Sequence, residues 1–305
     1  MTSHTQAPPA TVFRAVGGLQ LLTWPGLDVS GADAAVTARS GGVSSGPYAT
    51  LNLSLSVGDD PASVLENRRR LAASFGASPE DLVFARQVHG AGVRVVGAAD
   101  AGSGAFGLDD AIADADALVT ATPGVVLAIL TADCVPIVLH DPVAGLLACV
   151  HAGWRGTAAG VSAAAVAAMR ALGSRPADVI AGIGPAIDAT RYQVGPDVHQ
   201  AITQAFGPAA ASFIRPDARL DARPSTHPDS APDAPDSPDR WLLDLWTANR
   251  HALLQAGVPG PQIHTTSLPT GPTTPSYFFS DRTARPCGRL ALVARLRGPA
   301  RIQWM

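Results

Sequence analysis

Residues 135–151 contain two almost entirely apolar segments separated by a short turn. The first is VPIVLH, the second is GLLACVH, and DPVA lies between them, with Pro142 well suited to a turn. Neither segment alternates between apolar and polar side chains, which is typical of strands that are covered on both faces. The stretch therefore predicts a buried β-hairpin.

The hairpin brings a cysteine close to a histidine. If His140 pairs with Gly145, the register places Cys134 opposite His151. Directly opposed side chains of an antiparallel pair share a face and have Cβ atoms ~4.5–5.5 Å apart, which suits two ligands of one metal ion. The inference depends on the turn, because a slip of one residue would put the two side chains on opposite faces.

The third expected ligand is His89 in RQVHG, at the end of an expected strand and beside Gly90. A catalytic zinc site takes three protein ligands and keeps one position open. The other histidines fit less well, because they lie in the N-terminal tail, a polar insert, expected helices, a turn or a strand. The alternative is that these cysteine and histidine side chains only pack, which is the commoner role of such residues on strands.

Residues next to the expected ligands add polar and aromatic groups. Asp133 precedes Cys134 and is a candidate to orient the metal ligands or to accept a proton, while Trp154 and Arg155 follow His151 and could stack a base and hold an anion. Cys149 lies among apolar residues and is interpreted as a buried thiol. Cys287 in RPCGR is interpreted as a loop cysteine.

The remaining chain predicts a mixture of helices and strands that do not alternate strictly, which argues against a doubly wound nucleotide fold. Asp60-Pro61 predicts a helix start, and Gly76 its end. The stretch LVFARQVHGAGVRVV predicts two strands joined through a turn at His89-Gly90. Residues 1–12 predict a flexible tail. Residues 216–239, rich in Pro, Asp, Ala and Ser, predict a disordered insertion in one domain spanning 13–305.

The charged residues restrict the chemistry. All 22 basic residues are arginine, so a phosphate-binding or Schiff-base lysine is excluded. A phosphate must therefore be held by arginine, backbone amides or a metal. The net charge of −3 predicts no broad basic surface for nucleic acid. Three cysteines, with neither a signal peptide nor an apolar run long enough to span a membrane, predict a cytoplasmic protein.

Several motifs together resemble the YfiH-like, laccase-domain family, also called polyphenol oxidase or peptidoglycan editing factor and now interpreted as purine nucleoside phosphorylase. They are ARSGGVSSGPYATLNLS, VLENRRRL, RQVHG, DADALVT, TADCVPIVLHDP, CVHAGWRGTAAGV and LDLWTANRHALLQAGV. The resemblance spans roughly residues 17–296. The chain departs from the family pattern at Ser56, near His264 and in DRTARPCGR, residues 281–289.

The resemblance implies an α+β fold, a single four-layer α/β/β/α domain with mixed sheets. It also implies a zinc site formed by His89, Cys134 and His151. The implied activity is phosphorolysis of adenosine, inosine, guanosine and methylthioadenosine, with adenosine deamination besides. We expect Arg155 first, and then Arg39 and Arg68, to contact phosphate or ribose.

Deamination would use water on the metal, with Asp133 as the group that moves the proton, so His89, Cys134, His151 and Asp133 are the expected catalytic residues. Three other functions stay open: a copper-dependent polyphenol oxidase, a hydrolase that edits muropeptides, and a non-catalytic zinc protein. Copper is the less expected metal, because the chain has no H-x-H pair. Structural zinc sites usually close four protein ligands.

Overall fold

The computed structural model describes residues 11–28, 30–218, 240–272 and 276–298. Its helices are α1 Pro25–Asp28, α2 Pro61–Ser74, α3 Trp154–Ala158, α4 Val161–Ala171, α5 Pro196–Phe206 and α6 Leu245–Gln255. Its strands are β1 Val12–Val16, β2 Leu19–Thr23, β3 Ala32–Thr37, β4 Leu82–Phe84, β5 Val93–Val95, β6 Ala117–Thr120, β7 Val126–Thr131, β8 Val135–Asp141, β9 Leu146–Ala152, β10 Ile180–Ile183, β11 Gln193–Val194, β12 Ile214–Pro216, β13 Trp241–Leu243, β14 Ile263–Thr265 and β15 Leu290–Leu296.

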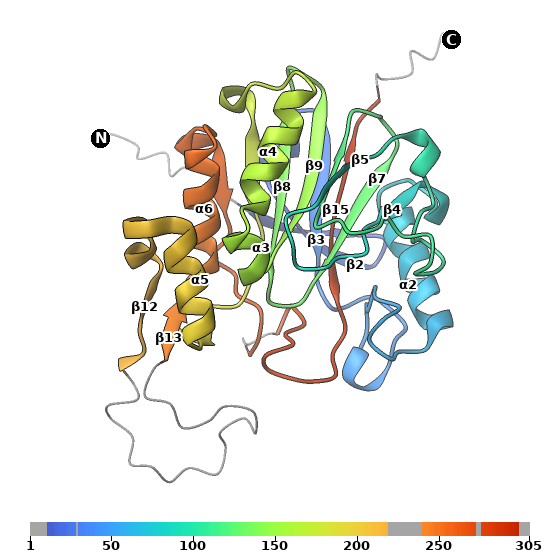
Figure 1. Ribbon diagram of the computed structural model, residues 1–305. Coiled ribbons are helices and arrows are strands. Elements are labelled where there is room, and N and C mark those ends of the chain that lie inside the picture. The colour runs from blue at the N-terminus through green and yellow to red at the C-terminus, as the bar shows by residue number, and fades with distance from the viewer. Residues whose placement is uncertain (1–10, 29, 219–239, 273–275, 299–305) are drawn as a thin grey trace, which may run out of the picture.

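Two six-stranded mixed sheets pack face to face. The first has the order β1-β2-β3-β15-β7-β4 and the second has the order β14-β10-β8-β9-β6-β5, and a small sheet β11-β13-β12 lies beside them. Helix α2 covers the outer face of the first sheet, and helices α3 to α6 lie against the outer face of the second (Figure 1). The expected four-layer α/β/β/α arrangement is confirmed.

Side chains of the central hairpin alternate between two cores. On β9, Ala148 and Val150 face the helices, while Leu147 and Cys149 face the first sheet. Every residue of β8 and β9 is buried, as the missing polar alternation predicted. Because His151 follows Cys149 by two residues, its side chain leaves the strand on the face between the sheets.

The predicted register of the hairpin is wrong by two residues. Asp141 pairs with Leu146, so the turn is Pro142–Gly145, and the partner of His151 is Pro136 rather than Cys134. The Asp141 carboxylate accepts the backbone N–H groups of Val143 and Ala144, and Gly145 has a φ of 64°. Because the slip is an even number of residues, each side chain keeps its predicted face.

The predicted turn at His89-Gly90 does not join a hairpin. Strand β4 pairs in parallel with β7 in the first sheet, and β5 pairs in parallel with β6 in the second. His89 therefore lies on a connection that crosses from one sheet to the other.

The helix predicted at Asp60-Pro61 is confirmed. The carboxylate of Asp60 caps α2 by accepting the N–H groups of Ala62 and Ser63. The predicted tail and insertion fall largely on residues 1–10 and 219–239, which lie outside the described residues. Val12 already belongs to β1, and Pro216 ends β12.

Candidate metal centre and its surroundings

His151 lies near the end of β9 and is 2% exposed. Its Nδ1 lies 2.8 Å from Oδ1 of Asp116, a residue that is completely buried. Since an ionised carboxylate only accepts hydrogen bonds, Nδ1 carries the proton and Nε2 keeps its lone pair for another partner. This is how histidine ligands of metals are usually oriented.

Asp116 also organises the loop that carries His89. Its carboxylate accepts the backbone N–H groups of Val88, His89 and Gly90, at 3.3, 3.0 and 2.6 Å. Its backbone oxygen accepts the N–H of His151 at 2.7 Å. Asp116 therefore positions two of the expected ligands. The sequence analysis did not identify Asp116. The available signal was an acidic residue directly before the apolar strand ALVT, where a charged side chain is unusual.

His89 and Cys134 both follow strands of the first sheet and lie at tight bends. His89 has a φ of 60°, and Asp133, the residue before Cys134, has a φ of 89°. Non-glycine residues rarely adopt such values outside turns and functional sites. The His89 side chain is exposed, whereas Cys134 is partly buried. Both bends turn a side chain toward the end of β9.

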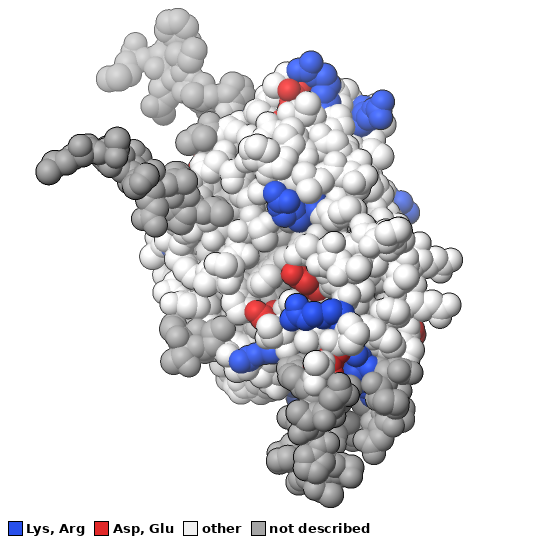
Figure 2. Space-filling view, turned by 90° about the vertical axis from the view of Figure 1, so that its left-hand side faces the viewer, with Lys and Arg blue, Asp and Glu red and all other residues white. Residues whose placement is uncertain are grey.

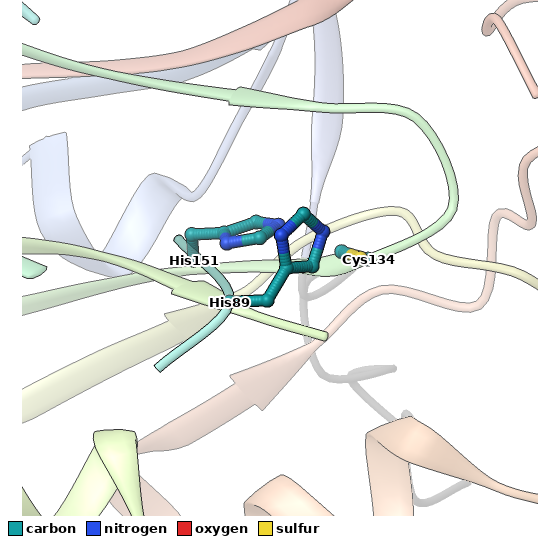
Figure 3. A group of neighbouring side chains, drawn as sticks. All are labelled: His89, Cys134 and His151. Carbon is teal, nitrogen blue, oxygen red and sulfur yellow. The ribbon is translucent and has the colours of Figure 1, made fainter. Parts of the chain in front are cut away.

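The three expected ligands come together. Their candidate ligand atoms all lie within 4.8 Å of one another (Figure 3). The imidazole rings of His89 and His151 are edge-on, with centroids 4.8 Å apart and planes at 84°. A tetrahedral zinc ion with bonds of 2.0–2.3 Å would need ligand atoms about 3.3–3.7 Å apart. The three side chains lie close enough together that they could hold a metal.

Gly153 lies against this cluster. A Cβ atom at this position would be 2.8 Å from Sγ of Cys134 and 3.3 Å from Cδ2 of His89. Both distances are shorter than ordinary van der Waals contact, so only glycine fits without displacing a ligand.

The electrostatics of the cluster favour a thiolate. Burial would raise the pKa of the Cys134 thiol, but the charge and hydrogen bonds of His151, followed by those of His89, lower it below its usual value. Burial would lower the pKa of His151, but Cys134 and Asp116 raise it. Cysteine binds metals as the thiolate, and metal binding would displace the proton shared by this group.

Asp133 is buried and tied to the C-terminal part of the chain. Its Oδ1 accepts the Thr270 hydroxyl at 2.5 Å, and its Oδ2 accepts the backbone N–H of Arg282 at 2.7 Å. Both oxygens are therefore engaged in fixing loops. These bonds give Asp133 a positioning role beside Cys134, and its expected role as a proton acceptor stays a prediction.

The three expected arginines lie in different environments. Arg155 is exposed on α3, with its guanidinium 4.3 Å from the centroid of the Trp154 ring. Arg68 is 1% exposed, and its guanidinium donates to the carbonyl oxygens of Leu53, Gly104 and Ala105. Arg68 therefore lies in the core, where its Nε and Nη1 donate to backbone carbonyl groups, and its expected contact with phosphate or ribose stays a prediction.

Arg39 donates two hydrogen bonds to the carbonyl oxygen of Ala49 and lies 4.7 Å from the centroid of the Phe279 ring. It lines a cavity of about 290 Å³, whose wall also contains Ser280 and Thr283. Arg39 is therefore placed to contact a ligand, but in a cavity whose described lining does not include the three-residue cluster.

Several of the remaining cysteines and histidines are buried or engaged in contacts within the fold. Cys149 is fully buried and burial raises the pKa of its thiol, while Cys287 is a buried residue that follows the exposed residues 282–286. His140 bonds the carbonyl oxygens of Leu146 and Ser30, and His199 stacks on Trp241. Within the described ranges, the cluster of His89, Cys134 and His151 is the one group of such side chains placed to hold a metal.

On the face that Figure 2 shows, basic residues are few, and in its lower half they lie next to acidic ones. Among the described helices, none is both long and apolar enough to cross a membrane.

Comparisons with known proteins place the chain in a family. Residues 33–297 match the family model described as "Multi-copper polyphenol oxidoreductase laccase". The chain is 38% identical over 269 residues to purine nucleoside phosphorylase YlmD of Geobacillus stearothermophilus, covering 87% of this chain and 91% of that protein. It is 48% identical over 181 residues to a purine nucleoside phosphorylase of Deinococcus radiodurans, covering 59% of this chain and 66% of that protein.

A solved structure with a similar sequence has the same fold. The crystal structure of the hypothetical protein YfiH of Bacillus licheniformis superposes with a TM-score of 0.80 at 33% identity, over 93% of this chain and 99% of the other. With a family model matching most of its length and a relative that it covers almost end to end, the chain belongs to the laccase-domain, YfiH-like family.

Proposed function

We propose that this protein is a zinc-dependent purine nucleoside phosphorylase that accepts adenosine, inosine, guanosine and methylthioadenosine, with adenosine deamination as a second activity. The observation that carries the proposal is the three-ligand cluster of His89, Cys134 and His151, held by Asp116. Three ligands leave a fourth position open for water or substrate, as in catalytic zinc sites. The names of the relatives supply the substrate class.

The reaction sets clear requirements for the side chains. A phosphate oxygen forms a bond to C1′ of the ribose while the C1′–N9 bond breaks. The electron pair of the C1′–N9 bond leaves with the purine, and a proton is then transferred to the purine ring. The products are ribose 1-phosphate and the free base. Exposed Arg155 would bind the phosphate, and the Trp154 ring beneath it would fix the guanidinium. Arg39 is retained as a ribose or phosphate contact on the strength of the cavity that it lines.

A bound zinc ion would act as a Lewis acid and lower the pKa of a water molecule toward ~7, which is the chemistry that deamination needs. The protein supplies the orientation. Asp116 holds the His151 ring and the His89 loop, and Asp133 holds the bend before Cys134. The three cysteines are free thiols, which suits the reducing cytoplasm, where purine nucleosides and phosphate are available.

The residues favour zinc over a multi-copper centre, despite the description of the family model. Multi-copper oxidation needs several histidine-rich copper sites that pass electrons between them. Outside the cluster, His140 bonds backbone carbonyls, and His199 and His251 pack against aromatic rings. No contact of the described residues specifically favours muropeptide editing.

The test is a turnover assay with metal-analysed protein. Each of the four nucleosides is incubated with and without phosphate, and the bases, ribose 1-phosphate and inosine are separated chromatographically. We expect base release that requires phosphate, and inosine from adenosine in its absence. Oxidation of phenols by the copper-loaded protein, with no base released by the zinc-loaded protein, would overturn the proposal.

Two cysteine variants sharpen this assay. Cys134→Ala removes a cluster side chain, and we expect it to lose both zinc and turnover. Cys149→Ala removes a buried thiol of the same hairpin that takes no part in the cluster. It should lower the free energy of unfolding by about 1 kcal/mol and keep its zinc and its activity.

A further inference from the structure

The C-terminal segment around Arg282 is anchored beside the metal cluster. The backbone N–H of Arg282 donates to Oδ2 of Asp133 at 2.7 Å, and Asp133 immediately precedes Cys134. Thr270 holds the other oxygen of the same carboxylate. The position of the Arg282 backbone relative to the cluster is therefore set by a partly buried hydrogen bond.

The Arg282 side chain is exposed, but contacts with neighbouring residues hold it in place. Its Nη1 donates to the carbonyl oxygen of Gln193 at 3.0 Å, and its guanidinium lies 5.2 Å from the centroid of the Tyr192 ring. Among the described residues, no carboxylate forms an ion pair with Arg282 or with Arg155. Two guanidinium groups thus keep donors available for an anion.

Both arginines flank Cys134. The backbone N–H of Arg282 is bonded to the carboxylate of Asp133, the residue before Cys134. Arg155 lies two residues after Gly153, where a Cβ atom would be 2.8 Å from Sγ of Cys134. The charges of both guanidinium groups also reach the partly buried Tyr192 phenol, where they oppose the rise in its pKa that burial and the Cys134 thiolate cause.

We propose that Arg282 and Arg155 bind the phosphate co-substrate together, and that Tyr192 is a positioning residue that holds the Arg282 guanidinium over its ring. Phosphate carries about two negative charges and offers several acceptor oxygens, and planar guanidinium groups match it with paired hydrogen bonds. The chain has no lysine to share this task. The inference rests on the proposed function, since it identifies the residues that bind the second substrate of that reaction.

The first experiment measures KM for phosphate and for inosine separately in Arg282→Ala. We expect KM for phosphate to rise about tenfold or more, as loss of a charge-assisted hydrogen bond implies, while KM for inosine and zinc content stay within twofold. The matched control is Arg285→Ala. Arg285 lies three residues away in the same segment, is 76% exposed and pairs with Asp281. It should leave both KM values unchanged.

The absence of lysine permits a second, independent test. Arg282→Lys places one side-chain amine in the whole protein, so an amine-selective acylating reagent can be followed at position 282 by peptide mass mapping. We expect inorganic phosphate to slow this acylation several-fold. In Arg285→Lys, phosphate should have no such effect. Arg282→Lys should also recover part of the phosphate affinity that Arg282→Ala loses.

The outcomes separate this proposal from the proposed function. Phosphorolysis with an unchanged phosphate KM in Arg282→Ala would overturn the assignment of Arg282 and leave the phosphorylase standing. Phosphate protection of Lys at 282 in a protein without phosphorolysis would support the anion site and overturn the phosphorylase. If Arg282→Ala unfolds, the Arg282→Lys protection experiment decides, and absence of protection refutes the proposal.

Discussion

Asp116→Asn tests whether one buried carboxylate organises the metal centre. Oδ1 accepts from His151 Nδ1 and the His89 N–H, and Oδ2 accepts from the N–H groups of Val88 and Gly90. An asparagine has one oxygen and one NH₂ group, so one of these donor pairs must face another donor. If the NH₂ faces His151, the ring must accept at Nδ1 and carry its proton on Nε2, where it can no longer bind a metal.

The expected loss of zinc affinity follows from the hydrogen bonds that Asp116→Asn cannot make. Loss of a hydrogen-bond partner that orients a metal ligand typically lowers metal affinity 10- to 100-fold, which corresponds to ~1.4–2.7 kcal/mol. A hydrogen bond to a charged group contributes ~1.5–3 kcal/mol, so the metal-free variant should also unfold more easily. We expect the zinc dissociation constant of Asp116→Asn to rise within that range, with the thermal stabilisation by zinc reduced in proportion.

The assay is a competition titration of chelator-stripped protein against a chromophoric zinc chelator, with melting temperatures measured with and without zinc. The control is Asp114→Asn. Asp114 is exposed, lies two residues away and has a φ of 49°, which asparagine tolerates well. A zinc dissociation constant for Asp116→Asn within twofold of the parent protein would refute the proposed role of this carboxylate.

Three further predictions address packing and pH. Gly153→Ala should sharply weaken zinc binding, measured by the same titration, because its Cβ would lie 2.8 Å from Sγ of Cys134; unchanged affinity would show that the cluster tolerates a methyl group there. Arg68→Ala should lower the free energy of unfolding in denaturant by about 3 kcal/mol or more, with turnover per folded molecule unchanged, and a specific rise in KM for phosphate would support Arg68 as a ligand. Burial would raise the pKa of Asp141, but the hydrogen bond from Ser174 and those from backbone N–H groups lower it. The contribution of the Asp141 carboxylate to the free energy of unfolding is therefore present above about pH 4. It is lost as the pH falls through the lowered pKa that Asp141 has in the folded protein. The stability difference between the parent and Asp141→Ala should shrink below about pH 4, and a difference independent of pH would exclude ionisation as its source.

The hairpin shows which part of the site was accessible from the sequence. Apolar composition predicted buried strands, and side-chain alternation predicted that His151 leaves β9 on the face shared with Cys149. The turn was placed two residues out of register, because Asp141 looks like a turn residue yet extends β8 and pairs with Leu146. The predicted face of His151 was nevertheless right, because a slip of two residues leaves every side chain on the same face of the sheet.

Contacts between distant segments were not accessible in this way. Asp116 reaches the loop of His89 and the ring of His151, and Arg282 reaches Asp133 across 149 positions of sequence. No local periodicity encodes such contacts. The surroundings of Arg68 were hidden for the same reason, since only the fold reveals that its guanidinium already donates to three carbonyl groups of the core.

The placement of the three cluster residues explains why they meet at all. His89 lies on the connection from β4 to β5 and Cys134 on the connection from β7 to β8, and both connections lead from the first sheet to the second. His151 lies near the end of β9, beside β8 and β6. The cluster thus forms where the chain twice crosses between the packed sheets, so the separation of its ligand atoms depends on the core between those sheets. A cavity-forming substitution there, such as Leu147→Ala, should therefore weaken zinc binding together with stability, whereas an equal loss of stability in the α2 layer, such as Leu71→Ala, should leave zinc affinity unchanged.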